Sequence, residues 1–190
     1  MILKKVVTLV FLCTGMLISS GQESDPWSLG IGVNIVDNSG SRFDELLNIK
    51  ENWNISRLLK ATIEKRFEYD FGVEISFSMN SFTRGKVINS VVNQEKVNYF
   101  AVDVMVKNYF SNYLEDARHA KFALYIVGGW GGNFFNATIN ETLNIGIGLN
   151  IKLGTYLWLN FQTLGKFSID ENTPGNANHL QHSTSVIFWL

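Results

Sequence analysis

Residues 143–153, LNIGIGLNIKL, decide the fold of this chain. The odd positions of this stretch are all Leu or Ile, and the even positions carry Asn, Gly, Gly, Asn and Lys. Successive side chains of a β-strand point to opposite faces, so this alternation predicts a strand with one apolar face and one small, polar face.

The same alternation recurs along most of the chain. Eight segments show it, namely residues 27–37, 55–65, 71–82, 99–107, 122–128, 143–153, 156–165 and 180–190. Two of them are weaker, because Arg57 interrupts the apolar side of the second segment and the fifth has apolar side chains on both faces. The pattern predicts an all-β protein of eight strands.

The links between these strands differ in length. Short turns are expected at residues 66–70 and 154–155, and the link over residues 108–120 is the least regular. Longer links are expected over residues 38–54, 83–96, 129–141 and 166–179. An even number of strands with its long links at one end predicts an up-and-down antiparallel barrel, with both termini at the end of the short turns.

The composition excludes several classes of protein. Hydrophobic residues make up 46% of the 190 residues and the net charge is -1, which excludes a disordered tail and a nucleic-acid binder. Charged residues amount to 17%, below the roughly 25% of soluble domains. After the N-terminus no apolar run approaches the roughly 20 residues of a membrane-spanning helix, so the apolar residues belong to strand faces.

The N-terminus has the features of a signal peptide, which we predict over residues 1–21. Two lysines precede an apolar run that ends in small residues at positions 19–21. The only cysteine, Cys13, lies inside this segment. We therefore expect no disulfide, thiol chemistry or thiolate metal site in the mature barrel domain, residues 22–190. An uncleaved N-terminal anchor is the alternative.

An eight-stranded barrel can be soluble, with an apolar interior, or can span a membrane with its apolar face outward. Here the polar face consists mainly of small residues that suit a narrow lumen, and the apolar face is bulky and almost uncharged. We expect a transmembrane β-barrel, and a soluble lipocalin-like barrel is the alternative. The aromatic residues expected to form the girdle at the membrane boundaries are Trp27, Phe67, Tyr69, Phe71, Tyr109, Phe110, Tyr156, Phe188 and Trp189.

Five charged residues fall on the inward-facing positions of the predicted strands: Lys60, Glu74, Asp103, Lys107 and Lys152. Opposite charges in a narrow barrel are expected to pair, because an isolated buried charge is far more costly than a paired one. A turn centred near Phe67 would place Lys60 opposite Glu74, and Lys107 could reach Glu74 from the other side. Such pairs would plug the lumen. The alternative is a set of charges solvated by water in the lumen.

Three motifs could carry chemistry, and each has a simpler interpretation. His179 and His182 are three residues apart, which places them on opposite faces of a strand and disfavours a shared metal ion. Ser183 beside His182 could form a nucleophile and base, but adjacent strand residues also point apart and no orienting carboxylate is evident. The glycine-rich residues 128–132 precede no helix that could hold a phosphate, so we expect a flexible loop there. We predict no catalytic residue, no metal and no cofactor.

Four segments carry a family resemblance: DPWSLGIGVNIVDNSG (residues 25–40), ISRLLKATIEKRF (55–67), LWLNFQT (157–163) and QHSTSVIFWL (181–190). They resemble the N-terminal barrel of OmpA-family proteins from Bacteroidota, over nearly the whole mature chain. In that family the barrel is typically followed by an acidic linker and a domain that binds peptidoglycan. This sequence stops at Leu190, so the resemblance implies an OmpA-type barrel without that domain, and wall tethering is not carried over.

The resemblance also implies a C-terminal signal for the barrel assembly machinery, formed here by Val186, Phe188, Trp189 and Leu190. We expect a monomeric, non-enzymatic outer-membrane protein of a Gram-negative bacterium with a structural or membrane-integrity role. Its expected partners are outer-membrane lipid and the assembly machinery, and no nucleic acid. A narrow pore of the same fold and, less favoured, an outer-membrane lipid-modifying enzyme are the alternatives.

Overall fold

The computed structural model describes residues 26–37, 49–68, 70–85, 87–88, 91–92, 94–114, 120–135, 138–169 and 178–190. The predicted signal peptide lies outside these residues. Within the described part of the chain, no helix is both long and apolar enough to cross a membrane.

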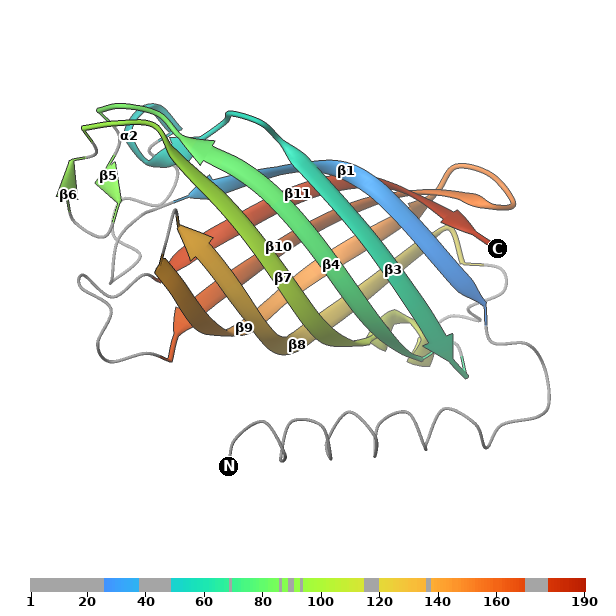
Figure 1. Cartoon of the computed structure of the whole chain (residues 1–190). Helices are drawn as coiled ribbons and strands as arrows, with labels where there is room; N and C mark the ends of the chain where they lie inside the picture. The colour runs from blue at the N-terminus through green and yellow to red at the C-terminus, as the bar shows by residue number, and fades with distance from the viewer. Residues whose placement is uncertain are drawn as a thin grey trace.

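Eight long strands form a single closed sheet (Figure 1). They are β1 (Trp27–Asp37), β3 (Leu59–Phe67), β4 (Phe71–Phe82), β7 (Val97–Asn108), β8 (Phe122–Phe135), β9 (Thr138–Lys152), β10 (Leu157–Ser168) and β11 (His179–Trp189). Each strand pairs antiparallel with the next long strand along the chain. Pairing of β1 with β11, from Ser28 opposite Trp189 to Asp37 opposite Leu180, closes the barrel. The predicted all-β, eight-stranded up-and-down antiparallel barrel is confirmed.

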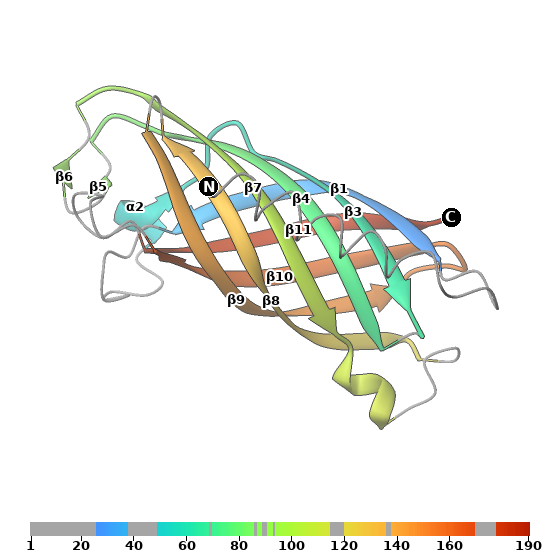
Figure 2. The ribbon, with the colours of Figure 1, turned by 60° about the horizontal axis from the view of Figure 1, so that its bottom comes forward.

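Short elements mark the two ends of the barrel (Figures 1 and 2). The loop end carries α2 (Ile49–Asn52), β2 (Trp53–Asn54), β5 (Val87–Ile88) and β6 (Val91–Val92). There β2 pairs with the last two residues of β1. The turn end carries the 3-10 helix η1 (Phe110–Tyr113), the β9–β10 turn, the start of β1 and the C-terminus.

The two faces of the sheet differ in chemistry, as the sequence pattern predicts. Apolar side chains such as Leu29, Ile75 and Ile147 lie exposed on the outer surface, and Ile147 has 65% of its surface exposed. The side chains at the alternate positions point inward and are buried, and most of them are polar. Exposed hydrocarbon around a polar interior is the arrangement of a transmembrane β-barrel and the reverse of a soluble one.

The predicted flexible loop over residues 129–141 is wrong, because β8 continues to Phe135 and β9 begins at Thr138. The glycines hide this continuation because they interrupt the apolar alternation. Close packing accounts for them: a side chain at Gly131 would collide with the carboxylate of Asp103, and one at Gly129 would collide with the backbone of β7. Glycine in a strand commonly marks such a close approach.

Candidate functional site

The barrel lumen holds the largest group of buried charges in the described structure. Seven inward-facing charged side chains are buried there: Lys60, Glu64, Arg66, Glu74, Asp103, Lys107 and Lys166. They arise from β3, β4, β7 and β10, whose inward positions alternate with the apolar outer positions.

A turn-end cluster of Glu64, Arg66, Glu74, Lys107 and Tyr109 occupies the lumen near the short turns. The register places Glu64 directly opposite Glu74, so two carboxylates share one site. Lys107, whose side chain is fully buried, lies between them, with Nζ 2.8 Å from Glu64 Oε2 and 2.5 Å from Glu74 Oε2. Lys107 therefore offsets the repulsion between two like charges, and Arg66, in an ion pair with Glu64, supplies the second positive charge of the cluster.

Tyr109 and Arg66 complete this cluster. The Tyr109 hydroxyl donates a hydrogen bond to Glu64 Oε1 at 2.5 Å, and burial raises the pKa of this hydroxyl, which keeps its proton in place. The guanidinium of Arg66 lies close to two aromatic rings, with Cζ 3.6 Å from the centroid of Tyr109 and 4.5 Å from that of Trp189. Cation–π contacts with both rings thus help to fix the position of Arg66.

A loop-end cluster centres on Asp103. Lys166 Nζ lies 2.5 Å from Asp103 Oδ1, and Asn144 donates to the same oxygen at 2.8 Å. Ser76 approaches the second oxygen at 3.3 Å. Lys166 also reaches Asn133 at 3.3 Å, so this cluster joins β7, β8, β9 and β10 across the lumen.

The expected pairing of Lys60 with Glu74 is wrong. Phe67 lies opposite Phe71, which centres the β3–β4 turn two residues later than expected and places Lys60 opposite Ser78. Lys60 Nζ instead crosses to β10 and β11, 2.5 Å from Gln162 Oε1 and 3.0 Å from Ser183 Oγ. Among the described residues, no carboxylate forms an ion pair with Lys60, so its ammonium group is held by neutral hydrogen-bond acceptors.

The placement of Lys152 in the lumen network is also wrong. Lys152 ends β9 at the turn end, where its side chain is exposed and Nζ lies 5.7 Å from the centroid of the Trp158 ring. Of the five residues expected in the network, Lys107 and Glu74 pair with each other. Lys60 contacts Gln162 and Ser183, and Asp103 belongs to the loop-end cluster.

Three buried lumen charges are not among the five that the sequence alternation predicts: Glu64, Arg66 and Lys166. Glu64 has the same parity as Lys60 and lies within the predicted segment 55–65, so the alternation already indicated that it faces inward. Arg66 also has this parity, but it was assigned to the turn over residues 66–70, whereas β3 continues to Phe67. Lys166 was assigned to a loop because β10 was expected to end at residue 165, whereas it continues to Ser168.

The two histidines of β11 face opposite sides, as expected. His179 points into the lumen, where Nε2 lies 3.1 Å from the Tyr99 hydroxyl. Ser183 also points inward, onto Lys60. The described residues contain no group of three or more His, Cys, Asp or Glu side chains that could hold a metal ion.

His182 lies on the outer face and has a carboxylate neighbour that we did not expect. Its Nδ1 is 3.0 Å from Thr163 Oγ1, and its Nε2 is 3.8 Å from Asp37 Oδ2, with the Trp53 ring against the imidazole. Sequence could not reveal this cluster, because β2 folds back onto the end of β1. A hydroxyl, an imidazole and a carboxylate in this order could act as a nucleophile, a base and an orienting group. Such a site also needs N–H donors for an oxyanion, but the backbone of Thr163 is paired with strands on both sides, which leaves no free N–H group beside it.

Most of the expected girdle residues are exposed near the turn end, including Trp27, Phe71, Phe110, Tyr156 and Phe188. Tyr109 and Trp189 do not belong to the girdle, because both pack on Arg66 inside the barrel mouth. Tyr69 lies outside the described residues. In the C-terminal segment, Phe188 and Leu190 are exposed, Val186 is half-buried on the same outer face, and Trp189 turns inward.

No protein-family model matches the chain, and no curated protein matches its sequence. Several solved structures match its fold. Neisserial surface protein A aligns with a TM-score of 0.60 at 9% identity, covering 89% of this chain and 99% of that one. The Yersinia pestis outer membrane protein Ail in a phospholipid nanodisc aligns with a TM-score of 0.50 at 13% identity, covering 87% and 99%.

Outer membrane protein W of E. coli also aligns with a TM-score of 0.50 at 13% identity, covering 89% of this chain and 100% of that one. At these identities the likeness concerns the fold. This chain therefore has the fold of the small outer-membrane β-barrels.

Proposed function

We propose that this chain is a small, monomeric outer-membrane β-barrel protein with a structural or membrane-integrity role, and that its lumen is closed to ions by its buried charge pairs. The apolar outer surface supports contact with lipid on all sides of the barrel. The shared fold with outer-membrane barrels over nearly the full length of this chain supports the same location.

The observation that carries the closed lumen is the reach of the buried lysines across the barrel. Lys107 extends from β7 to carboxylates on β3 and β4, and Lys166 extends from β10 to Asp103 on β7. Lys60 extends from β3 to Gln162 on β10. An ion passing along the lumen would have to separate these buried partners, which is costly in a narrow, poorly solvated space.

The proposed topology follows from the same fold. Bacterial barrels keep long loops outside the cell and short turns in the periplasm. The loop end would then face the exterior, and both ends of the barrel domain would face the periplasm. Residues 1–21 would be removed during export, and Val186, Phe188, Trp189 and Leu190 would serve as the assembly signal.

Planar-bilayer recording tests the closed lumen against the pore alternative. The full chain, purified and inserted at single-molecule density, should show little or no current. The double variant Lys107→Met with Lys166→Met should conduct more, because both charged crossings are lost. A steady open-channel current from the unmodified protein would overturn the proposal and favour a pore.

A further inference from the structure

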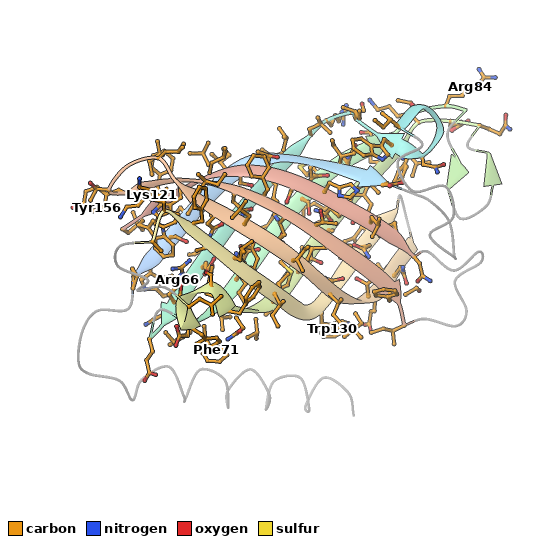
Figure 3. All side chains as sticks on the ribbon, turned by 180° about the vertical axis from the view of Figure 1, so that it is seen from behind. Arg66, Phe71, Arg84, Lys121, Trp130 and Tyr156 are labelled. Carbon is orange, nitrogen blue, oxygen red and sulfur yellow. The ribbon has the colours of Figure 1, made fainter. Side chains whose placement is uncertain are left out.

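Two grooves are hollowed into the apolar outer surface, and Ile147 forms a wall of both. The first groove, of about 480 Å³, is lined among others by Asn108 of β7, Gly128 of β8 and Ile145 of β9. These residues extend from the turn end, where β7 stops, to the middle of β8 and β9. The groove therefore lies between the turn end and Trp130, the next outward-facing residue of β8, which Figure 3 shows on the outer surface.

The second groove, of about 260 Å³, lies on the other side of Ile147. It is lined among others by Leu124 of β8, Phe161 of β10 and Phe110 of η1. Ser111 ties η1 to this part of the sheet, because its hydroxyl accepts a hydrogen bond from the backbone N–H of Leu124 at 3.0 Å. Both grooves thus begin at the segment that joins β7 to η1, and both extend toward the middle of the barrel.

Gly128 opens the first groove, although packing within the protein does not require a glycine there. Among the described residues, a side chain added at Gly128 would meet only the carbonyl oxygen of Asn144 within 4 Å, at 3.8 Å. The strand pairing runs through Gly128 on both sides in unbroken register, so no bulge is present. Glycine inside a strand commonly marks a bulge, a close approach of another backbone or a close approach of a ligand. With the first two excluded, the missing side chain indicates a ligand on the outer surface.

The polarity of the first groove changes along its length. Its walls within the strands are apolar, and its turn end is formed by Asn108, whose amide nitrogen donates a hydrogen bond to the Tyr113 hydroxyl at 2.8 Å. Phe110 and Tyr113 are exposed at this level, where aromatic residues mark the membrane boundary. The occupant therefore needs a hydrocarbon part toward the middle of the membrane and a polar part at its boundary.

We propose that the two grooves bind one diacyl phospholipid of the leaflet at the turn end, with one acyl chain on each side of Ile147 and the polar groups beside Asn108 and Tyr113. Two chains joined at one glycerol match two grooves that share a wall and begin at the same segment. A chain lying in a groove makes more van der Waals contacts than a chain on a smooth surface. The site rests on the proposed contact of the outer surface with lipid, and it goes beyond that contact because one lipid is held at one fixed place.

The experiment counts bound lipid by native mass spectrometry of the full chain in a neutral detergent. The probes are dioleoylphosphatidylethanolamine, which has two chains, and its lyso form, which has the same head and one chain. The unmodified protein should retain one molecule of the two-chain lipid saturably. The lyso form should bind roughly tenfold more weakly or worse, because one groove stays empty of hydrocarbon.

One variant and its matched control test the groove itself. Gly128→Leu fills the first groove, and the open space around this position lets the variant fold with the urea midpoint of the parent. Its affinity for the two-chain lipid should fall roughly tenfold, because one chain loses its contacts. Gly132→Leu is the control, since Gly132 faces outward on the same strand, lies outside both grooves and leaves a new side chain 3.7 Å from the Phe134 ring. It should bind lipid as the unmodified protein does.

Three results would overturn the proposal. Equal binding of the two-chain and one-chain lipids by the unmodified protein would remove the case for two chains, and this comparison needs no variant. Unchanged binding by a folded Gly128→Leu would mean that the lipid lies elsewhere. A dimer of the unmodified protein that Gly128→Leu dissociates would mean that a second copy fills the groove.

Failure of this site and failure of the proposed function are distinguishable. Loss of the bound lipid leaves the closed lumen untouched, because conductance is measured separately. If the outer surface did not meet lipid at all, Ile147→Arg would keep the parent's stability in vesicles, and the proposed function would then fail together with the site.

Discussion

Replacing Lys107 with Met should destabilise the barrel more than any other single change among its charged residues. Met fills a similar volume, so the substitution removes the charge with little change in packing. Glu64 and Glu74 would then face each other in register with no cation between them, and Arg66 lies 3.6 Å from only one of them.

The size of the effect follows from burial. Lys107 is fully enclosed and both carboxylates are about 2% exposed, so solvent can screen little of the repulsion that remains. Removing one partner of a buried ion pair typically costs about 3–5 kcal/mol. The present case leaves two carboxylates uncompensated, so we expect a loss at the upper end of that range.

The assay is reversible unfolding by urea of the protein inserted in lipid vesicles, followed by tryptophan fluorescence and extrapolated linearly to water. Lys152→Met is the matched control, because this exposed lysine should contribute less than about 0.5 kcal/mol. Adding Glu74→Gln to Lys107→Met should recover part of the loss, because one of the two facing charges is gone. The resulting coupling between positions 74 and 107 is measured by a double-mutant cycle.

A loss for Lys107→Met no greater than for Lys152→Met would refute this reasoning. It would mean that water in the lumen solvates the carboxylates, which is the alternative to charge pairing given in the sequence analysis. A stability of Lys107→Met that recovers when the salt concentration is raised would point to the same conclusion, because salt screens buried charges only weakly.

Three further predictions concern the faces and ends of the barrel. Ile147→Arg should cost about 2–4 kcal/mol in vesicles, because Ile147 is exposed at the middle of the outer surface, and a parent-like unfolding curve would mean that this face does not meet lipid. Gly148→Val should cost roughly 1–3 kcal/mol in the same assay, since a side chain there would overlap the Tyr125 ring, and an unchanged stability would contradict the observed packing. Trypsin added to intact cells should cut after Arg84 at the loop end and spare Lys121 at the turn end; the opposite result would invert the topology.

The alternation in the sequence is sufficient to predict the fold and to predict which side chains of each strand point inward and which point outward. It places β1 and β4 at their observed bounds, because both strands keep an unbroken apolar parity. It fails in β8, where successive glycines remove the apolar signal while the strand continues. Propensity and pattern describe one strand at a time, whereas the need for glycine in β8 arises from the neighbouring strand β7.

The candidate site was less predictable, because pairing depends on register. Parity alone shows that Lys60 and Glu74 face inward, but a two-residue difference in the centre of one turn changes which of them meet. The contact of His182 with Asp37 depends on β2, a two-residue strand with no periodic signal. Chemistry that spans several strands therefore needs the three-dimensional register.

The glycines connect the fold to the lumen charges. A side chain at Gly72 would meet the carboxylate of Glu64, and a side chain at Gly131 would meet that of Asp103. Each of these two carboxylates thus occupies space that a glycine on the neighbouring strand leaves empty, which lets it reach a lysine in the narrow barrel. At these two positions, a glycine on the inner face makes room for a charged side chain of the adjacent strand. Enlarging either glycine should displace its carboxylate from the lysine and weaken the same cluster that Lys107→Met or Lys166→Met would disrupt.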